Sequence, residues 1–430
     1  MHVPPKRFGA ELRRARHERG MTLTRLASAV HYSKSQLSKI ENGHQRPTAH
    51  LARRCEVELD CPGRLIALLP DPPTPTSPTP TSPAAAGPPS RRLVLTAGAA
   101  TVLLAGGAPG GAATSAPGEQ AGDGSLVDSA RALLTHFRRM AQSCPPPTVL
   151  VPLAEQTRAL VALAADSGSG ARNGLLLVAA RFAEFTGWMA QESGHDEAAR
   201  RWTDHAARLA FDGGDHQLGH YGLVRRALMA YYRGHAAETV ALSAAAGDHR
   251  LAPRIRGLAA QQEAEGHALA GDHGASLRTL DRARDLLAAA EREEDPAPVG
   301  TSHLADPVTM FTGWCLYDLG RPAAAAEHLD AACAALPPQA HRNLARYGVR
   351  RALAHASAGE IDHACALART ALPSASAVAS YTIGLDLRRL AGVLGRHREH
   401  SGVRALAPDL TAALTLSAAA RTAPPLPKPA

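Results

Sequence analysis

The chain has 430 residues, of which 45% are hydrophobic and only 4% aromatic. A chain of this length forms roughly two to four domains, and this apolar content excludes wholesale disorder. The apolar residues are mainly Ala and Leu, which favour packed helices over β-sandwiches rich in aromatic and β-branched residues. Six cysteines are too few for a disulfide scaffold. We therefore predict an all-α protein.

The net charge of +8 is concentrated at the N-terminus. Residues 1–70 contain 13 basic and six acidic residues, a net charge of +7, whereas the other 360 residues contain 34 basic and 33 acidic ones. Such an excess in a small domain is typical of proteins that bind a polyanion. No apolar run follows Met1 closely, so we expect no conventional signal peptide.

Apolar residues at helical spacing predict five short helices in the N-terminal domain. Their inward positions are Phe8, Leu12 and Ala15; Leu23, Leu26, Ala27 and Val30; Leu37 and Ile40; Leu51, Ala52 and Cys55; and Leu65, Leu68 and Leu69. Thr22, Ser33 and Thr48 are the expected N-caps of the second, third and fourth helices. Gly20 and Gly43 are expected to end the first and third.

The second and third of these helices carry a recognisable pattern. The segments TLTRLA at 22–27 and SKSQLSKIENG at 33–43 resemble the helix-turn-helix of the lambda-repressor-like (Cro/cI, XRE) family. The resemblance covers residues 6–70 and implies that the helix at 33–42 enters the major groove of DNA. Two positions depart from the family, which often has Gln at the start of the second helix and Gly in the turn.

The exposed polar residues of this motif are the expected DNA contacts. The predicted set is Thr22, Ser33, Lys34, Ser35, Gln36, Lys39, Asn42 and Arg46. By the resemblance, the two lysines, Ser35 and Gln36 enter the groove, where Lys can bind guanine and Gln can pair with adenine. The others are expected phosphate contacts, with Ser33 at a helix N-terminus that can hold an anion.

A Pro-, Thr- and Ser-rich linker is predicted over 71–125. It includes a short apolar segment at 93–113 that follows Arg91 and Arg92, and three interpretations of that segment remain open. Against a membrane span, its dense apolar part, 93–105, is shorter than a bilayer requires. Against an export signal, such a signal would lie at the N-terminus. The favoured interpretation is a helix that docks on the body or on a second protomer, or a simple linker. We therefore expect a cytoplasmic, nucleoid-associated protein, with a single-pass membrane protein as the alternative.

Residues 126–420 contain a repeating pattern of glycines and small residues. Gly194, Gly234, Gly271, Gly320 and Gly359 are the candidate turns. Seven residues before them stand Gly187, Ala227, Ala264, Gly313 and Ala352; five after stand Ala199, Thr239, Ser276, Ala325 and Ala364; twelve after stand Ala206, Ala246, Ala283, Ala332 and Ala371. Small residues at fixed offsets allow the helices of stacked hairpins to approach closely.

This pattern resembles the tetratricopeptide repeat over about 180–372, with longer loops than usual. The resemblance implies an α-solenoid with a concave groove that binds extended peptides or partner helices. Five aromatic residues fall on the first helices of the hairpins and either line this groove or fill the core between helices: Phe185, Trp188, Tyr231, Trp314 and Tyr317. The second interpretation is favoured at their spacing.

No pattern of residues predicts catalysis. The chain has no P-loop, Gly-x-Ser-x-Gly or dinucleotide fingerprint, and neither Cys55 with Cys61 nor His397 with His400 has metal-ligand spacing. We expect no enzyme, cofactor or metal. The order of parts resembles a bacterial transcriptional regulator: a homodimer that binds a double-stranded DNA operator and takes a peptide or protein effector in its repeats. The alternatives are a membrane-tethered regulator and a repeat-based interaction scaffold.

Overall fold

The computed structural model describes residues 5–30, 32, 34–69, 119–292, 299–300, 306–422 and 429. The N-terminal domain, called the head below, contains α1 (Pro5–Glu18), α2 (Leu23–Ala29), α3 (Lys34–Glu41), α4 (Ala49–Leu59) and the 3-10 turn η1 (Ile66–Leu68). The last of the five predicted helices is thus a single 3-10 turn, although Leu65 beside it is buried in the head core as expected.

Local signals in the sequence set the ends of the head helices. The Thr22 side chain accepts a hydrogen bond from the Arg25 amide and begins α2, and Thr48 begins α4 in the same way. Gly20 and Gly43 follow α1 and α3 with positive φ, a conformation that glycine adopts without a steric cost. The predicted cap Ser33 lies outside the described residues.

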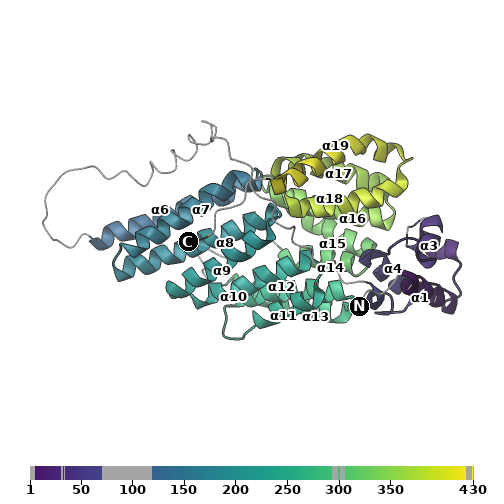
Figure 1. Ribbon diagram of the computed structural model, residues 1–430, viewed down its shortest axis with the longest axis horizontal. Coiled ribbons are helices and arrows are strands. Elements are labelled where there is room, and N and C mark those ends of the chain that lie inside the picture. The colour runs from purple at the N-terminus through teal and green to yellow at the C-terminus, as the bar shows by residue number, and fades with distance from the viewer. Residues whose placement is uncertain are drawn as a thin grey trace, which may run out of the picture.

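The rest of the described chain is a succession of antiparallel helices, called the body below, that starts with α6 at the left of Figure 1 and proceeds towards the head at the right. Its elements are α6 (Glu119–Met140), α7 (Pro146–Ala165), α8 (Ser169–Glu192), α9 (Asp196–Asp212), α10 (His216–Tyr232), α11 (Ala236–Ala245), α12 (Pro253–Ala270), α13 (His273–Ala290), α14 (Pro307–Asp318), α15 (Pro322–Ala334), α16 (His341–Ala358), α17 (Ile361–Val378), α18 (Tyr381–Leu394), η2 (Gly395–His397), α19 (Ser401–Ala419) and η3 (Ala420–Thr422). The described residues form no strand, which confirms the all-α prediction.

The body begins earlier than the sequence indicated. Helix α6 starts at Glu119, seven residues before the boundary expected at 126. The apolar segment at 93–113 lies outside the described residues. Within them, one helix, α7, is long and apolar enough to cross a membrane by length and composition. Val149, Leu153 and Leu160 of that helix are buried in the same apolar cluster as residues of α6 and α8.

The five predicted turn glycines all lie between paired helices. Each has φ between 78° and 95°, in the left-handed region where a side chain would be strained. They join α8 to α9, α10 to α11, α12 to α13, α14 to α15 and α16 to α17. The repeating unit is therefore a helical hairpin, and the glycine positions predicted the turns correctly.

The small residues that flank these glycines pack the two helices of each hairpin together. All five residues at the position after the turn are 0% exposed: Ala199, Thr239, Ser276, Ala325 and Ala364. They face the small position before the turn, since a Cβ on Gly187 would lie 3.2 Å from the Ala199 carbonyl oxygen. The residues twelve positions after the glycines are also buried, except Ala332, which is half-buried.

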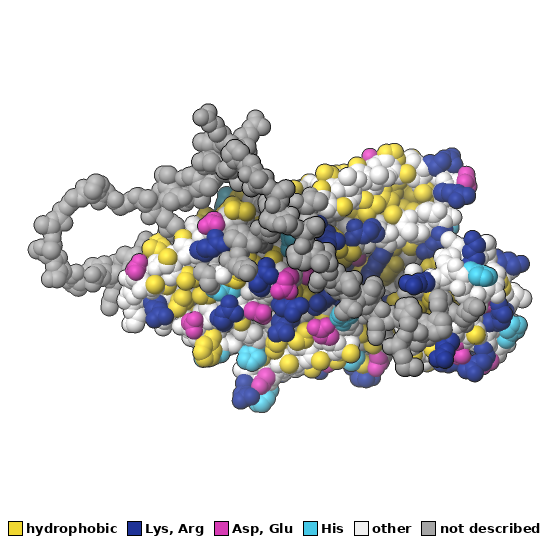
Figure 2. Space-filling model, in the orientation of Figure 1, with side chains coloured by type: hydrophobic (Ala, Val, Ile, Leu, Met, Phe, Trp, Pro, Cys, Tyr) yellow, Lys and Arg dark blue, Asp and Glu magenta, His cyan; other side chains and the backbone are white. Residues whose placement is uncertain are grey.

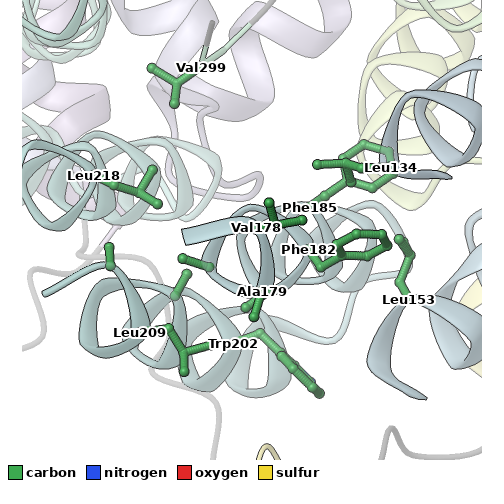
Figure 3. Close-up of a cluster of buried hydrophobic side chains, with 14 of the residues drawn as sticks. Leu134, Leu153, Val178, Ala179, Phe182, Phe185, Trp202, Leu209, Leu218 and Val299 are labelled. Atoms are coloured by element: carbon green, nitrogen blue, oxygen red, sulfur yellow. The ribbon is translucent and has the colours of Figure 1, made fainter. Parts of the chain in front are cut away.

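Larger side chains fill the space between successive hairpins. Figure 3 shows one such cluster, in which Phe182 and Phe185 of α8 lie between Leu134 of α6 and Trp202 of α9. The Phe137 and Phe182 rings meet edge to face, with centroids 6.1 Å apart. The buried apolar residues described in the body fall into three such clusters, each shared by neighbouring hairpins.

We expect Ala325→Leu to destabilise the body by about 1–3 kcal/mol, because Ala325 is fully buried and the three added heavy atoms have no room between α14 and α15. The matched control is Ala323→Leu on the same helix, where the side chain is exposed and the change should stay within about 0.5 kcal/mol. Urea unfolding of the full chain measures both. Equal effects of the two substitutions would show that the small column does not limit packing.

Candidate nucleic-acid interface and central cavity

Helix α3 presents a polar face to solvent. Leu37 and Ile40 are buried in the head core, which fixes the orientation of the helix. Lys34, Ser35 and Lys39 are exposed and Gln36 is half-buried. The four residues predicted to enter the major groove therefore lie on one accessible helix of the head. Figure 2 shows Lys and Arg side chains spread over this end of the molecule.

The other predicted DNA contacts differ in their surroundings. Arg46 and Thr22 are exposed, although the Thr22 hydroxyl is occupied as the α2 cap. The Asn42 side chain accepts a 2.6 Å hydrogen bond from Arg13 Nη2, so it presents its amide group together with a guanidinium. Ser33 lies outside the described residues, and its role as an anion-binding cap stays a prediction.

A buried ion pair that the sequence analysis missed holds α3 against α1. Arg16 Nε and Nη2 donate to the Glu41 carboxylate at 2.7 and 3.2 Å, and Arg16 Nη1 donates to the Met21 carbonyl. Gly9 of α1 lies so close that a Cβ there would be 2.3 Å from the Glu41 carbonyl oxygen. The Arg and Glu positions were visible in the sequence, but their 25-residue separation gave no signal that they pair.

Two arginines of the head are buried against the body. Arg53 Nη2 donates to the Leu269 carbonyl at the end of α12, and Arg54 Nη1 donates to the Ser357 carbonyl at the end of α16, both at 2.6 Å. Their side chains are 5% and 6% exposed. The C-terminal carbonyls of helices carry partial negative charge and lack intrahelical partners, which suits a cation.

Further contacts surround this interface. The turn at Gly320 lies against α4, where a Cβ would be 2.9 Å from the Arg54 amide nitrogen. Arg396 of the body stacks on Tyr32, in the turn between α2 and α3, at 3.9 Å. The charge of +7 predicted a polyanionic partner for the head, but Arg53 and Arg54, which contribute to that charge, are bonded to the body instead. The head docks directly on the body beside α14 (Figure 1).

The body encloses a cavity of about 180 Å³ on the inner side of the hairpins, called the central cavity below. Its helical lining comes from α6 and from the first helix of each hairpin from α8 to α16. The lining residues are Arg138, Gln142, Glu184, Phe185, Trp188, Glu192, Tyr221, Val224, Arg225, Leu228, Tyr232, Leu258, Gln261, Gln262, Glu265, Gly300, Phe311, Arg342, Asn343, Arg346, Tyr347 and Arg350.

The aromatic residues singled out from the sequence divide between cavity and core. Phe185 and Trp188 line the cavity, with ring centroids 5.4 Å apart. Tyr231, Trp314 and Tyr317 are buried between helices, and the Trp314 and Tyr317 rings stack. The core interpretation is therefore correct for these three residues, whereas a part for Phe185 and Trp188 in a peptide-binding groove stays a prediction.

The Glu192 carboxylate closes the cavity by joining hairpins that are far apart in sequence. It accepts from Arg342 at 2.8 Å and from Arg346 at 2.6 Å, both on α16. It also accepts from the hydroxyls of Ser380 and Thr382 at the start of α18. Burial alone would raise the pKa of Glu192, but the two arginines and the hydroxyls hold it at about 2.

One group of residues outside the cavity has the donor types of a metal site. Asp330, His355 and His363 place one possible ligand atom each within 4.8 Å of one another. The Asp330 carboxylate accepts a 2.5 Å hydrogen bond from Arg351, and His355 also contacts Glu360 at 2.6 Å. A guanidinium at this distance repels a cation, so the group is satisfied as an ion-pair network.

Comparison with known proteins gives one match. The family described as a helix-turn-helix domain matches residues 7–69. No curated protein and no solved structure shows a significant match to the chain. The match covers the head alone, and it supports the helix-turn-helix assignment of α2 and α3.

We expect Glu192→Gln to destabilise the body by roughly 3–5 kcal/mol, because two buried arginines lose their counter-charge. The folded-state pKa near 2 lies below the ordinary Glu value of 4.5. The stabilisation by Glu192 is therefore complete above about pH 4.5 and is lost as the pH falls towards 2. Thermal unfolding between pH 7 and pH 3 should show a flatter acid limb in the variant.

The control for that measurement is Glu197→Gln, which alters an exposed carboxylate on α9. It should leave stability at neutral pH within about 0.5 kcal/mol of the unchanged chain. If the Glu192→Gln protein is as stable as this control, the carboxylate does not hold α8 to α16 and α18.

Proposed function

We propose that the protein is a sequence-specific DNA-binding transcriptional regulator of the lambda-repressor-like class. The observation that supports this most directly is the exposed polar face of α3, on a head that matches a helix-turn-helix domain. In this proposal α3 enters the major groove, where Lys34 and Lys39 bind guanine edges and Gln36 pairs with adenine. A regulator of this kind is a cytoplasmic, nucleoid-associated protein, and its activity needs no catalytic group.

The lysine pair provides the test of this proposal. Lys34→Ala with Lys39→Ala should weaken specific DNA binding by about 2–6 kcal/mol, on the basis of 1–3 kcal/mol for each base contact. The cognate duplex is first selected from random sequences with the unchanged full chain. Gel shifts with that duplex then measure the affinity of the double variant at fixed salt concentration.

A matched control removes the same charge from the body, through Arg139→Ala with Arg278→Ala. Both arginines are exposed and lie on α6 and α13. This control should keep the affinity and specificity of the unchanged chain. Unaltered affinity of the lysine variant would exclude α3 as the reading helix. Two chains in each shifted complex would support the proposed homodimer, as expected when two helices read adjacent half-sites.

We further propose that the body binds a peptide or protein effector and passes its presence to the head. Two features support a connection between these parts. Arg350 of the cavity wall pairs with Asp386 at 2.9 Å, and Arg389 contacts both Asp386 and Asp318. Burial lowers the pKa of Arg53, and the nearby Asp318 carboxylate offsets part of this effect. The polar residues behind the cavity wall therefore act electrostatically on the docked head through Asp318.

The docked head should be released when its contacts are removed from both sides. Arg53→Met with Arg396→Ala eliminates the guanidinium at the α12 terminus and the one stacked on Tyr32. We expect hydrogen exchange in α4 to become at least about tenfold faster while helicity is unchanged. The control Arg7→Ala with Arg139→Ala changes exposed arginines of head and body. Equal exchange in both variants would argue against a docked head in solution.

A further inference from the structure

Several residues that line the central cavity carry buried polar atoms that lack protein partners. Within the described residues, Arg225 Nε, Gln261 Nε2 and Asn343 Nδ2 are buried donors without an acceptor. Gln142 Oε1 and Gln262 Oε1 are buried acceptors without a donor. All five residues line the cavity. Because unpaired buried polar groups cost stability, a cavity that gathers both kinds is suited to a ligand that supplies their partners.

The charges of the lining favour an anionic ligand. Five arginines and three glutamates line the cavity, and burial raises the pKa of Glu265 to about 8, so that this carboxyl is largely neutral at neutral pH. Arg342 and Arg346 are matched by Glu192, and Arg350 by Asp386.

The remaining positive charge lies on one side of the cavity. Arg138 has no carboxylate partner within the described residues and stacks at 5.9 Å on Phe185. Arg225 Nε is 3.7 Å from Glu184, too far for a hydrogen bond. Both arginines line the cavity together with Tyr221, on which both guanidinium groups act electrostatically. An anionic group of a ligand would therefore be attracted most strongly to this wall of the cavity.

The size and the apolar part of the cavity limit the ligand further. Its volume of about 180 Å³ is similar to that of an engineered cavity of about 150 Å³ that holds benzene. Phe185 and Trp188 form a tilted pair of rings in its wall, next to Arg138. One flat apolar group with a small polar head fills such a space, whereas a whole folded domain does not enter it.

We propose that the central cavity binds a small organic carboxylate that carries an amide and one flat apolar group. The carboxylate lies towards Arg138 and Arg225, the amide between Gln261, Gln262 and Asn343, and the apolar group against Phe185 and Trp188. A free acylated amino acid and the C-terminal residue of a peptide both offer this chemistry. This assignment rests on the proposed effector role of the body and names the chemical class of the effector.

The test uses the full chain and N-acetyl-L-phenylalanine, with N-acetyl-L-phenylalaninamide as its uncharged counterpart. Calorimetric titration should show binding of the acid that is at least about tenfold tighter than binding of the amide, because only the acid pairs with the two arginines. A tetrapeptide ending in phenylalanine with a free carboxylate, compared with its C-terminal amide, shows whether the opening admits a peptide. Tighter binding of the tetrapeptide than of the free acid identifies a peptide end as the better source.

Variants at the unpaired amides separate a ligand site from a structural one. Gln261→Met and Asn343→Leu replace groups without partners by apolar ones of similar size, so the unliganded chain should keep or raise its melting temperature. Binding of the acid should nevertheless fall at least about tenfold. The matched control is Gln156→Met on α7, where a buried amide oxygen is also unpaired but lies outside the cavity. It should leave binding unchanged.

Two outcomes overturn the assignment: equal binding of acid and amide, or no binding of the acid at about 10 mM, weaker than ordinary specific affinities. Loss of binding in the Gln156→Met control would also count against it. The titration contains no DNA, so it is independent of the regulator proposal. A chain that binds its selected duplex but not the acid contradicts only the ligand assignment, whereas the reverse result contradicts only DNA reading.

Discussion

The carboxylate of Glu192 is the interaction on which the shape of the body depends. It is 1% exposed, and it joins the end of α8 to α16 and α18, which lie 150 or more residues further along the chain. A buried charge is tolerated only when it is paired and hydrogen-bonded, and two guanidinium groups with two hydroxyls meet that need. The same contacts hold Glu192, Arg342 and Arg346 together in the wall of the central cavity.

The docking of the head on the body also depends on buried arginines that find hydrogen-bond acceptors. Helices α12 and α16 end in carbonyl groups that the following left-handed glycines leave facing outward, and Arg53 and Arg54 supply the donors. The basic residues of the head therefore do two different things. Those on α3 remain exposed, while Arg53 and Arg54 on α4 are buried against the body. A single count of charge cannot separate these uses, because it contains no information on which face of a helix is covered.

Much of the fold was predictable because its determinants are local. A cap such as Thr22 acts within three residues of itself, and a turn glycine such as Gly271 acts at one position. The small columns were readable for a related reason: the two helices of a hairpin are joined by a short turn, so their contacts recur at fixed offsets. Where the contact depends on distant segments, prediction failed, as for Arg16 with Glu41 and for the final 3-10 turn of the head.

The sequence by itself determined that the chain is helical, that it has a small basic head, and that small residues would bring paired helices together. It also placed Ser35, Gln36 and Lys39 on one face of one helix, since helical periodicity alone decides that. Only the tertiary structure decided that Glu192 joins α8 to α16 and α18, that five residues with unpaired polar atoms line one cavity, and that the head rests on helix ends. These features arise from groups separated by up to about 300 residues, and no periodic pattern encodes which of many arginines will meet which carboxylate or carbonyl.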